Sequence, residues 1–152
     1  MRQVDLIVAG KLTKGPFHTL VSDYTRRIQW PLKIFEIESK HKNARRVQDE
    51  EATQILAKIA PSAFVVALDE RGNGLKSLDF ARTLQNLQNS GESHIQFIIG
   101  GADGLTNSVR DQANMLLSFG QQTWPHMMAR VMLLEQIYRA QQILAGHPYH
   151  RE

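Results

Sequence analysis

The spacing of hydrophobic residues along the chain changes period repeatedly, which predicts strands alternating with helices. Residues 63–68 (AFVVAL) form a continuous apolar run, typical of a strand buried on both faces of a parallel sheet. Residues 32–38 alternate apolar and charged side chains, the period of a half-buried strand. Residues 44–59 place apolar side chains near helical spacing and end before Pro61. The complete prediction is strands at 4–10, 32–38, 63–68, 95–99 and 115–119, and helices at 16–28, 44–59, 77–87, 106–113 and 125–145.

This alternation predicts an α/β fold with a mostly parallel sheet and flanking helices. A chain of 152 residues is long enough to bury a core, and no linker or internal repeat divides it. We therefore expect a single domain spanning residues 1–152. Residues 69–76 and 100–104 contain glycine and are expected to be loops, with Ser77 capping the helix after the first of them.

The last predicted helix is apolar on more than the single stripe needed to pack on a sheet. A central core helix is one explanation. We favour a subunit interface, because a helix in a domain this small is rarely covered on all sides by its own chain. Arg130, Glu135 and Arg139 interrupt the apolar surface, and Arg130 is too far from Glu135 in helical spacing to pair with it. Arg130 is therefore expected to find a partner elsewhere or a ligand.

The amino-acid composition excludes several kinds of chemistry and location. The sequence has no cysteine, which excludes disulfides and thiol catalysis. No apolar run reaches the ~18 residues of a membrane span, and the first residues do not resemble a signal peptide. We therefore expect a cytoplasmic protein with no membrane partner. The net charge of +3 permits an anionic partner, although ordinary solvated surface explains each basic group about as well. These groups are Lys11 with Lys14, Arg26-Arg27, Lys40-His41-Lys42 and Arg45-Arg46.

Two glycine-bearing loops follow the two buried strands. Residues 100–104 (GGADG) come after one strand, and residues 68–72 (LDERG) end the other. Open α/β sheets bind ligands at the carboxyl ends of their strands, where glycine lets the backbone approach a ligand closely. Neither loop has the spacing of a dinucleotide or phosphate-loop motif. Two such loops at one edge of a sheet favour a pocket there.

Aromatic and titratable side chains are concentrated at the end of the chain, after the predicted helix stops at Gly146. Residues 147–151 carry two histidines, a tyrosine and an arginine, which suggests that the terminus is part of a site. The nearest further histidine, His126, lies at the other end of a helix about 30 Å long. A zinc site needs more ligands than the two terminal histidines supply, so we expect no metal.

Several of these motifs together closely resemble the RlmH family, bacterial methyltransferases of the SPOUT superfamily. The resemblance extends over essentially the whole chain, from Val8 to Glu152. Its motifs are Leu68-Asp69, residues 98–105 (IIGGADGL), 123–126 (TWPH), 135–140 (EQIYRA) and 148–152 (PYHRE).

The resemblance implies a SPOUT-type fold with a C-terminal trefoil knot, a homodimer and S-adenosyl-L-methionine as cofactor. It also implies that the substrate is N3 of a pseudouridine in a hairpin loop of 23S rRNA, which we expect the protein to meet on the assembled ribosome. Gln121 and Gln122 depart from the smaller or apolar residues expected in the family. The implied cofactor-binding positions are Leu68, Gly100, Phe119, Gly120, Gln121, Gln122, Thr123 and Trp124.

The expected chemistry requires removal of the N3 proton or stabilisation of the resulting anion. We expect Arg139 to stabilise charge on the uracil oxygens, and His150 or Tyr149 to receive or relay the proton. An ion pair with Glu135, four residues earlier on the same helix, is the alternative role for Arg139. Two other functions stay open: a SPOUT-type tRNA methyltransferase, and a ribosome-associated RNA-binding protein without catalysis.

Overall fold

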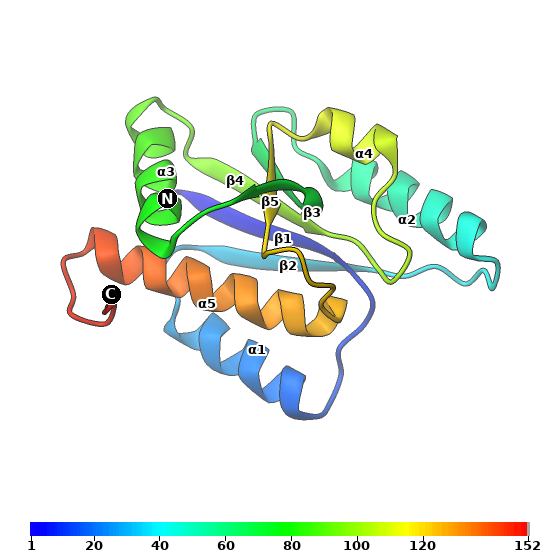
Figure 1. Cartoon of the computed structure of the whole chain (residues 1–152), viewed down its shortest axis with the longest axis horizontal. Helices are drawn as coiled ribbons and strands as arrows, with labels where there is room; N and C mark the ends of the chain where they lie inside the picture. Colours follow the sequence, from blue (N-terminus) through cyan, green and yellow to red (C-terminus); the bar gives the residue numbers. More distant parts are fainter. Residues whose placement is uncertain (152) are drawn as a thin grey trace.

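The computed structural model describes residues 1–151, and Glu152, the last residue of the terminal motif, lies outside them. Five parallel strands form one sheet in the order β2-β1-β4-β3-β5, with helices on both faces (Figure 1). The predicted α/β class and parallel sheet are confirmed. The elements are β1 (Gln3–Ala9), α1 (Pro16–Arg27), β2 (Leu32–Ile37), α2 (Ala44–Lys58), β3 (Phe64–Gly74), α3 (Ser77–Asn89), β4 (His94–Ile99), α4 (Asn107–Gln112), β5 (Met115–Ser118) and α5 (His126–Leu144).

The predicted boundaries agree with the structure to within two residues, except at the end of β3. The expected loop at 69–76 is wrong, because β3 continues to Gly74. Leu68 and Asn73 both pair with Leu117, so the residues between them bulge out before the strand resumes alongside β5. Glycine and polar residues are typical of a loop, while pairing with β5 extends the strand through them.

Gly72 lies where this bulge crosses β5. A Cβ atom there would lie 2.5 Å from the carbonyl carbon and oxygen of Leu116 and 2.7 Å from the amide nitrogen of Leu117. Two backbones therefore pass so closely that only glycine fits without a backbone shift. This close contact lies immediately before β3 resumes its pairing with β5 at Asn73 and Leu117.

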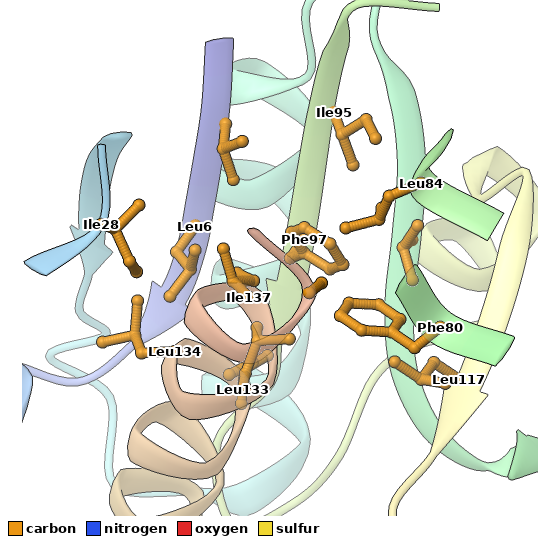
Figure 2. Packing of buried hydrophobic residues seen from close by; sticks show 14 of the residues in the cluster. Leu6, Ile28, Phe80, Leu84, Ile95, Phe97, Leu117, Leu133, Leu134 and Ile137 are labelled. Atoms are coloured by element: carbon orange, nitrogen blue, oxygen red, sulfur yellow. The ribbon is translucent and has the colours of Figure 1, made fainter. Parts of the chain in front are cut away.

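Two hydrophobic layers sandwich the sheet. Helices α1, α3 and α5 cover one face, and α2 and α4 cover the other. Alternate residues of each central strand point to opposite layers: Phe97 of β4 faces α3 and α5, whereas Ile98 packs with α2 and α4. Figure 2 shows Leu133 and Ile137 of α5 directed toward Phe97.

Helix α5 lies between α1 and α3 on the sheet, and every one of its residues is buried or partly buried (Figure 1). The central-core explanation therefore accounts for its innermost side chains, including Leu133 and Leu134. The Arg130 side chain is 2% exposed and bonds to the Glu36 carboxylate at 2.8 Å and to the Gly10 carbonyl at 3.0 Å. The expectation that Arg130 pairs away from Glu135 is confirmed.

The start of α3 differs from the prediction. Lys76, not Ser77, is the N-cap residue of α3, and the expected side-chain cap is wrong. The Ser77 hydroxyl instead donates a 2.7 Å hydrogen bond to Gln136 of α5.

Within residues 1–151, no helix combines the length and apolar character needed to cross a membrane.

Candidate functional site

A cavity of about 810 Å³ opens at the carboxyl edge of the sheet, where β4 and β5 end and β3 forms its bulge. Its walls are residues 68–71, 99–105 and 117–120 with the start of α5, so both predicted glycine loops meet in it. The structure brings seven of the eight implied cofactor positions to this cavity, while the exposed Gln121 is not part of its lining. The seven are Leu68, Gly100, Phe119, Gly120, Gln122, Thr123 and Trp124.

The loop after β4 is held closed by its own contacts. The Gly104 amide donates to the Gly101 carbonyl at 3.0 Å, and Gly104 takes a φ of +77°, which favours glycine. A Cβ at Gly100 would lie 2.8 Å from Leu105 and 3.2 Å from the Gly104 carbonyl carbon. Glycine at position 100 therefore lets the loop fold tightly onto Leu105, leaving backbone as the cavity wall.

The loop after β5 is organised by short-range hydrogen bonds. The Ser118 hydroxyl donates to the Gly120 carbonyl at 2.9 Å and accepts from the Gly120 amide at 3.1 Å. The Trp124 indole N–H donates to the Phe119 carbonyl at 3.1 Å, which holds a ring that is still 40% exposed at the cavity rim. These hydrogen bonds hold the loop in one conformation at the wall of the cavity.

Asp69 joins two walls of the cavity. Its carboxylate pairs with Arg71 of the β3 bulge and with Arg110 of α4, both at 3.3 Å. Burial opposes ionisation of Asp69, but hydrogen bonds from the two arginines outweigh it and lower the pKa of this carboxyl. The sequence singled out Leu68-Asp69 only as a strand end, because no local spacing links Asp69 to Arg110.

Glu51 of α2 lies behind the glycine loop. Its side chain is buried, its Oε1 has no hydrogen-bond partner, and a Cβ at Gly101 would lie 2.9 Å from its Oε2. Burial raises the pKa of Glu51, with a further contribution from the charge of Asp103. Sequence reasoning missed this carboxyl, since a glutamate within a helix is normally exposed.

His126 and Gln48 complete the rim. Gln48 donates to the carbonyls of Asp103 at 3.0 Å and Leu105 at 3.3 Å, which ties α2 to the glycine loop. Burial, with the nearby charge of Arg130, lowers the pKa of His126, so this imidazole is neutral at neutral pH. His126 was quoted in a sequence motif without a role, and its place at the cavity depends on the fold.

The three implied catalytic residues gather around Glu135 on the outer side of α5. Arg139 Nε donates to Glu135 at 2.8 Å, and its guanidinium carbon lies 4.8 Å from the centre of the Tyr149 ring. The Tyr149 hydroxyl donates to Glu135 at 2.6 Å, and Arg139 Nη1 lies 3.2 Å from His150 Nδ1. The Arg139–Glu135 ion pair, the alternative role considered for Arg139, is therefore present within a larger cluster.

The cluster constrains the protonation of its members. The hydrogen bond to Glu135, then burial and the charge of Glu135, raise the pKa of Tyr149, which stays protonated. The hydrogen bond to Glu135 also raises the pKa of Arg139. An arginine can only donate, so His150 Nδ1 must accept, and the neutral imidazole then carries its proton on Nε2.

The cavity and the cluster occupy different parts of α5. Ala129 lines the cavity and Arg139 belongs to the cluster, ten residues or about 15 Å along the helix axis. A second hollow of about 550 Å³ lies between them, lined by residues 74–77, residues 117–120, Met132 and Glu135. Within one chain, then, Glu135 borders a groove on the opposite side of the β5 loop from the main cavity.

Histidine, aspartate and glutamate side chains form no group of three or more suited to a metal in the part of the chain described, residues 1–151. His147 and His150 follow the end of α5, whereas His126 begins it.

Comparisons with known proteins agree with this geometry. A family described as "Predicted SPOUT methyltransferase" matches residues 2–150. The chain is 50% identical over 147 residues to the ribosomal RNA large subunit methyltransferase H of Rhodospirillum centenum, covering 96% of this chain and 97% of that protein. It is 41% identical over 150 residues to the protein of the same name from Zymomonas mobilis, covering 99% of both.

Solved structures share the fold at low identity. The SpoU methyltransferase AviRb from Streptomyces viridochromogenes, in complex with AdoMet, superposes with a TM-score of 0.50 at 15% identity, over 91% of this chain and 57% of AviRb. A probable methyltransferase from Bordetella pertussis gives a TM-score of 0.56 at 11% identity, over 91% and 95% of the two chains. With the family match over nearly the full length, this chain belongs to the SPOUT methyltransferase family.

Proposed function

We propose that the protein transfers a methyl group from S-adenosyl-L-methionine to N3 of a pseudouridine in a hairpin loop of 23S rRNA. The observation that carries the proposal is 50% identity over 147 residues to a ribosomal RNA large subunit methyltransferase H. A cavity formed at the three loops that the resemblance implies supports it. We further propose that the protein works in the cytoplasm on ribosomes, where this RNA is folded into its final shape.

The residues of the cavity fit the cofactor. Its volume of about 810 Å³ lies within the range of small-molecule sites, about 300–1,000 Å³. The Gly100 and Gly120 loops line the cavity with backbone that can offer donors and acceptors for polar groups of an adenosine, and Asp69, paired with Arg71 and Arg110, holds the adjoining walls in place. When bound, the cofactor would supply an electrophilic methyl group on a positively charged sulfur. Leu68, Gly100 and residues 119–124 are the proposed cofactor-binding residues.

We assign the remaining chemistry to the Glu135 cluster. The N3 proton of the pseudouridine must leave as the N–C bond forms, and negative charge develops on the uracil oxygens. Arg139, kept charged by Glu135, would stabilise that charge together with the Nε2–H of His150. Tyr149 would relay the proton to Glu135 across their 2.6 Å hydrogen bond without becoming a free phenolate, which its raised pKa disfavours.

The separation of about 15 Å between cavity and cluster leads us to propose a homodimer as the active form. A twofold axis perpendicular to α5 pairs two copies of the helix antiparallel, which places the cluster of one chain beside the cavity of the other. Partly exposed apolar side chains such as Met132 and the exposed Leu20 and Leu75 provide apolar surface near α5 for such an interface. Each cavity would then be completed by the tail of the second chain.

The C-terminal trefoil knot stays part of the proposal. The crossing of Gly72 over Leu116 and Leu117, and the return of α5 across the sheet after β5, support it. A knot would hold the three cavity loops together, because none of them could open without moving the others.

Radiolabelled methyl transfer tests the function. The purified protein, labelled S-adenosyl-L-methionine and RNA from cells lacking the gene should yield label in large-subunit rRNA. Label in tRNA instead would support a SPOUT-type tRNA methyltransferase. Binding of ribosomes with no transfer under any condition would support a non-catalytic RNA-binding protein.

Mixed dimers test the shared site. One chain carries Gly100→Val in the cavity and the other carries Arg139→Gln in the cluster, and each alone should be inactive. After subunit exchange, half of the dimers are mixed, each with one intact composite site, so about a quarter of the parent activity should return. No recovery in dimers verified as mixed would mean that each chain uses its own cluster.

A further inference from the structure

Positive charge is concentrated beside the cavity although the chain as a whole carries a net charge of only +3. The segment after β1 and the segment between β2 and α2 leave neighbouring strand ends, since Ala9 pairs with Ile37 and the Gly10 amide donates to the Ile37 carbonyl at 2.8 Å. The Leu12 amide donates to Glu36 at 2.8 Å and keeps the two segments side by side. Together with the first turn of α2 they form what we call the basic edge: Lys11, Lys14, Lys40, Lys42, Arg45 and Arg46.

The cations of the basic edge are exposed and mostly without acidic partners. Among residues 1–151, Lys11 alone of the six forms an ion pair, a 3.6 Å contact with Glu38. Of the neighbouring carboxylates, Glu50 is occupied by His41 at 3.1 Å and by Ser39 at 2.9 Å, and Glu36 by Arg130 at 2.8 Å, whereas Asp49 forms no ion pair in the part of the chain described. Elsewhere, seven arginines each pair with an aspartate or glutamate: Arg26, Arg27, Arg71, Arg82, Arg110, Arg130 and Arg139.

The basic edge also borders the cavity directly. Arg45 lies three residues before Gln48 on α2, and therefore on the same face, and Gln48 lines the cavity and holds its glycine loop. On the other segment, Gly10 packs against His126, which lines the same cavity. In Figure 1 both segments lie at the same end of the molecule as the loop after β4. A polymer lying on the basic edge would thus pass the cavity mouth.

The backbone N–H groups of Arg45 and Arg46 at the start of α2 are not available to bind an anion. Asn43 caps the helix and accepts from the amides of Arg45 and Arg46 at 3.0 and 3.3 Å. The anion-binding capacity therefore rests on the side chains. Exposed, unpaired lysines and arginines suit the phosphate groups of a nucleic-acid backbone, to which they bind without reading sequence.

We infer that the basic edge binds the phosphate backbone of the rRNA around the target hairpin and guides the target nucleotide to the cavity. This inference rests on the proposed function, and it names the surface that supplies affinity for the substrate. The six cations contribute counterion release, so binding through them weakens as salt concentration rises.

Charge-removal variants test the surface. The test variant and the control each replace four exposed cations by glutamine, so each changes the net charge from +3 to −1. The test variant acts on the basic edge, and the control acts away from it, near the starts of β1 and β2, at the end of α2 and in the middle of α3. The test substitutions are Lys40→Gln, Lys42→Gln, Arg45→Gln and Arg46→Gln, and the control substitutions are Arg2→Gln, Lys33→Gln, Lys58→Gln and Arg82→Gln.

Methylation of ribosomes lacking the modification is measured as KM and kcat between low and moderate KCl concentrations. The test variant should raise KM roughly tenfold or more at low salt. It should also lower the slope of log KM against log salt concentration by about 0.7–0.9 for each phosphate group that the protein no longer neutralises. The control should keep the parent KM and slope. Equal effects of both variants, or no effect of the test variant, would overturn the inference.

Two further measurements keep the test decisive. The pair Lys40→Gln/Lys42→Gln, confined to the loop, replaces the fourfold variant if that protein is unstable, and should give a smaller change of the same kind. Filter binding of the same proteins to 23S rRNA measures the surface without catalysis. A parent that binds this RNA through the basic edge but never methylates it would refute the proposed function and leave the surface assignment intact.

Discussion

The Tyr149 hydroxyl lies 2.6 Å from Glu135 and donates a hydrogen bond that ties the C-terminal tail to the middle of α5. The ring of Tyr149 packs edge-on against Tyr138, with 4.9 Å between ring centres, and beneath the Arg139 guanidinium. The tail is therefore ordered by an aromatic and a charged contact at once. Glu135 is the common acceptor of this arrangement, bonded to both Tyr149 and Arg139.

Replacing Tyr149 by phenylalanine removes the hydroxyl while keeping the ring packed. Methyl transfer should fall about 100-fold, the effect typical of losing a proton-transfer group. Cofactor affinity measured by calorimetry should stay within a few-fold of the parent. Tyr24→Phe is the matched control, because its hydroxyl lies 3.4 Å from the same carboxylate oxygen and forms a weaker contact. Normal transfer by Tyr149→Phe would remove Tyr149 from the proton path.

Replacing Gly100 by alanine should weaken cofactor binding roughly tenfold or more, since the new Cβ lies 2.8 Å from the Leu105 side chain and 3.2 Å from the Gly104 carbonyl carbon, so that both the side chain and the loop must adjust. Calorimetric titration with S-adenosyl-L-methionine measures the effect. The double variant Gly100→Ala/Leu105→Ala separates two causes. Recovered affinity would mean that loop displacement was responsible, whereas persistent loss would mean that the Cβ itself blocks the cofactor.

Gly72→Ala should be among the most destabilising alanine substitutions at a glycine of this chain. Its Cβ would lie 2.5 Å from the Leu116 backbone, and a strand backbone cannot move aside as a side-chain tip can. We expect a loss of about 1–3 kcal/mol in the free energy of unfolding, measured by urea denaturation. Gly74→Ala is the control, because its nearest atom would be 3.9 Å away, and it should change stability by under about 1 kcal/mol. Equal stability of both variants would contradict the close crossing.

Glu51 should make the protein less stable as pH rises above about 4.5. Burial raises the pKa of Glu51 above its ordinary value of 4.5, so the folded state holds this proton more tightly than the unfolded state does. The stabilisation is complete below the unfolded pKa and is lost as pH rises through the folded pKa. Glu51→Gln should remove this dependence and gain relative to the parent toward neutral pH. Parallel stability–pH curves for the two proteins would show that Glu51 is not perturbed.

Much of the architecture followed from local pattern. The alternation in residues 32–38 and the apolar run at residues 63–68 predicted two strands, whose observed starts lie within two residues of the expected ones. The end of β3 did not follow, because its last residues are held by β5, a partner about 45 residues later in the chain. Local pattern cannot show a pairing over that separation.

Some contacts of the candidate site could likewise be predicted from the sequence, and others could not. The Arg139–Glu135 pair was predictable from its four-residue spacing on one helix. The pairing of Asp69 with Arg110, the burial of Glu51 and the contact of Tyr149 with Glu135 join segments that only the fold brings together. Sequence motifs shared with the family located the cavity loops. The charged groups that support these loops could not be recognised from the residues beside them in the sequence.

Nucleoside analysis of 23S rRNA tests the central claim most directly. Cells lacking the gene are complemented with the parent or with Arg139→Gln, and the 23S rRNA is digested and measured by mass spectrometry. The parent should restore N3-methylpseudouridine in one hairpin loop, and Arg139→Gln should leave that pseudouridine unmethylated while still binding S-adenosyl-L-methionine. Unmodified 23S rRNA in cells that contain folded, cofactor-binding parent protein, or a restored methyl group in tRNA instead, would contradict the account.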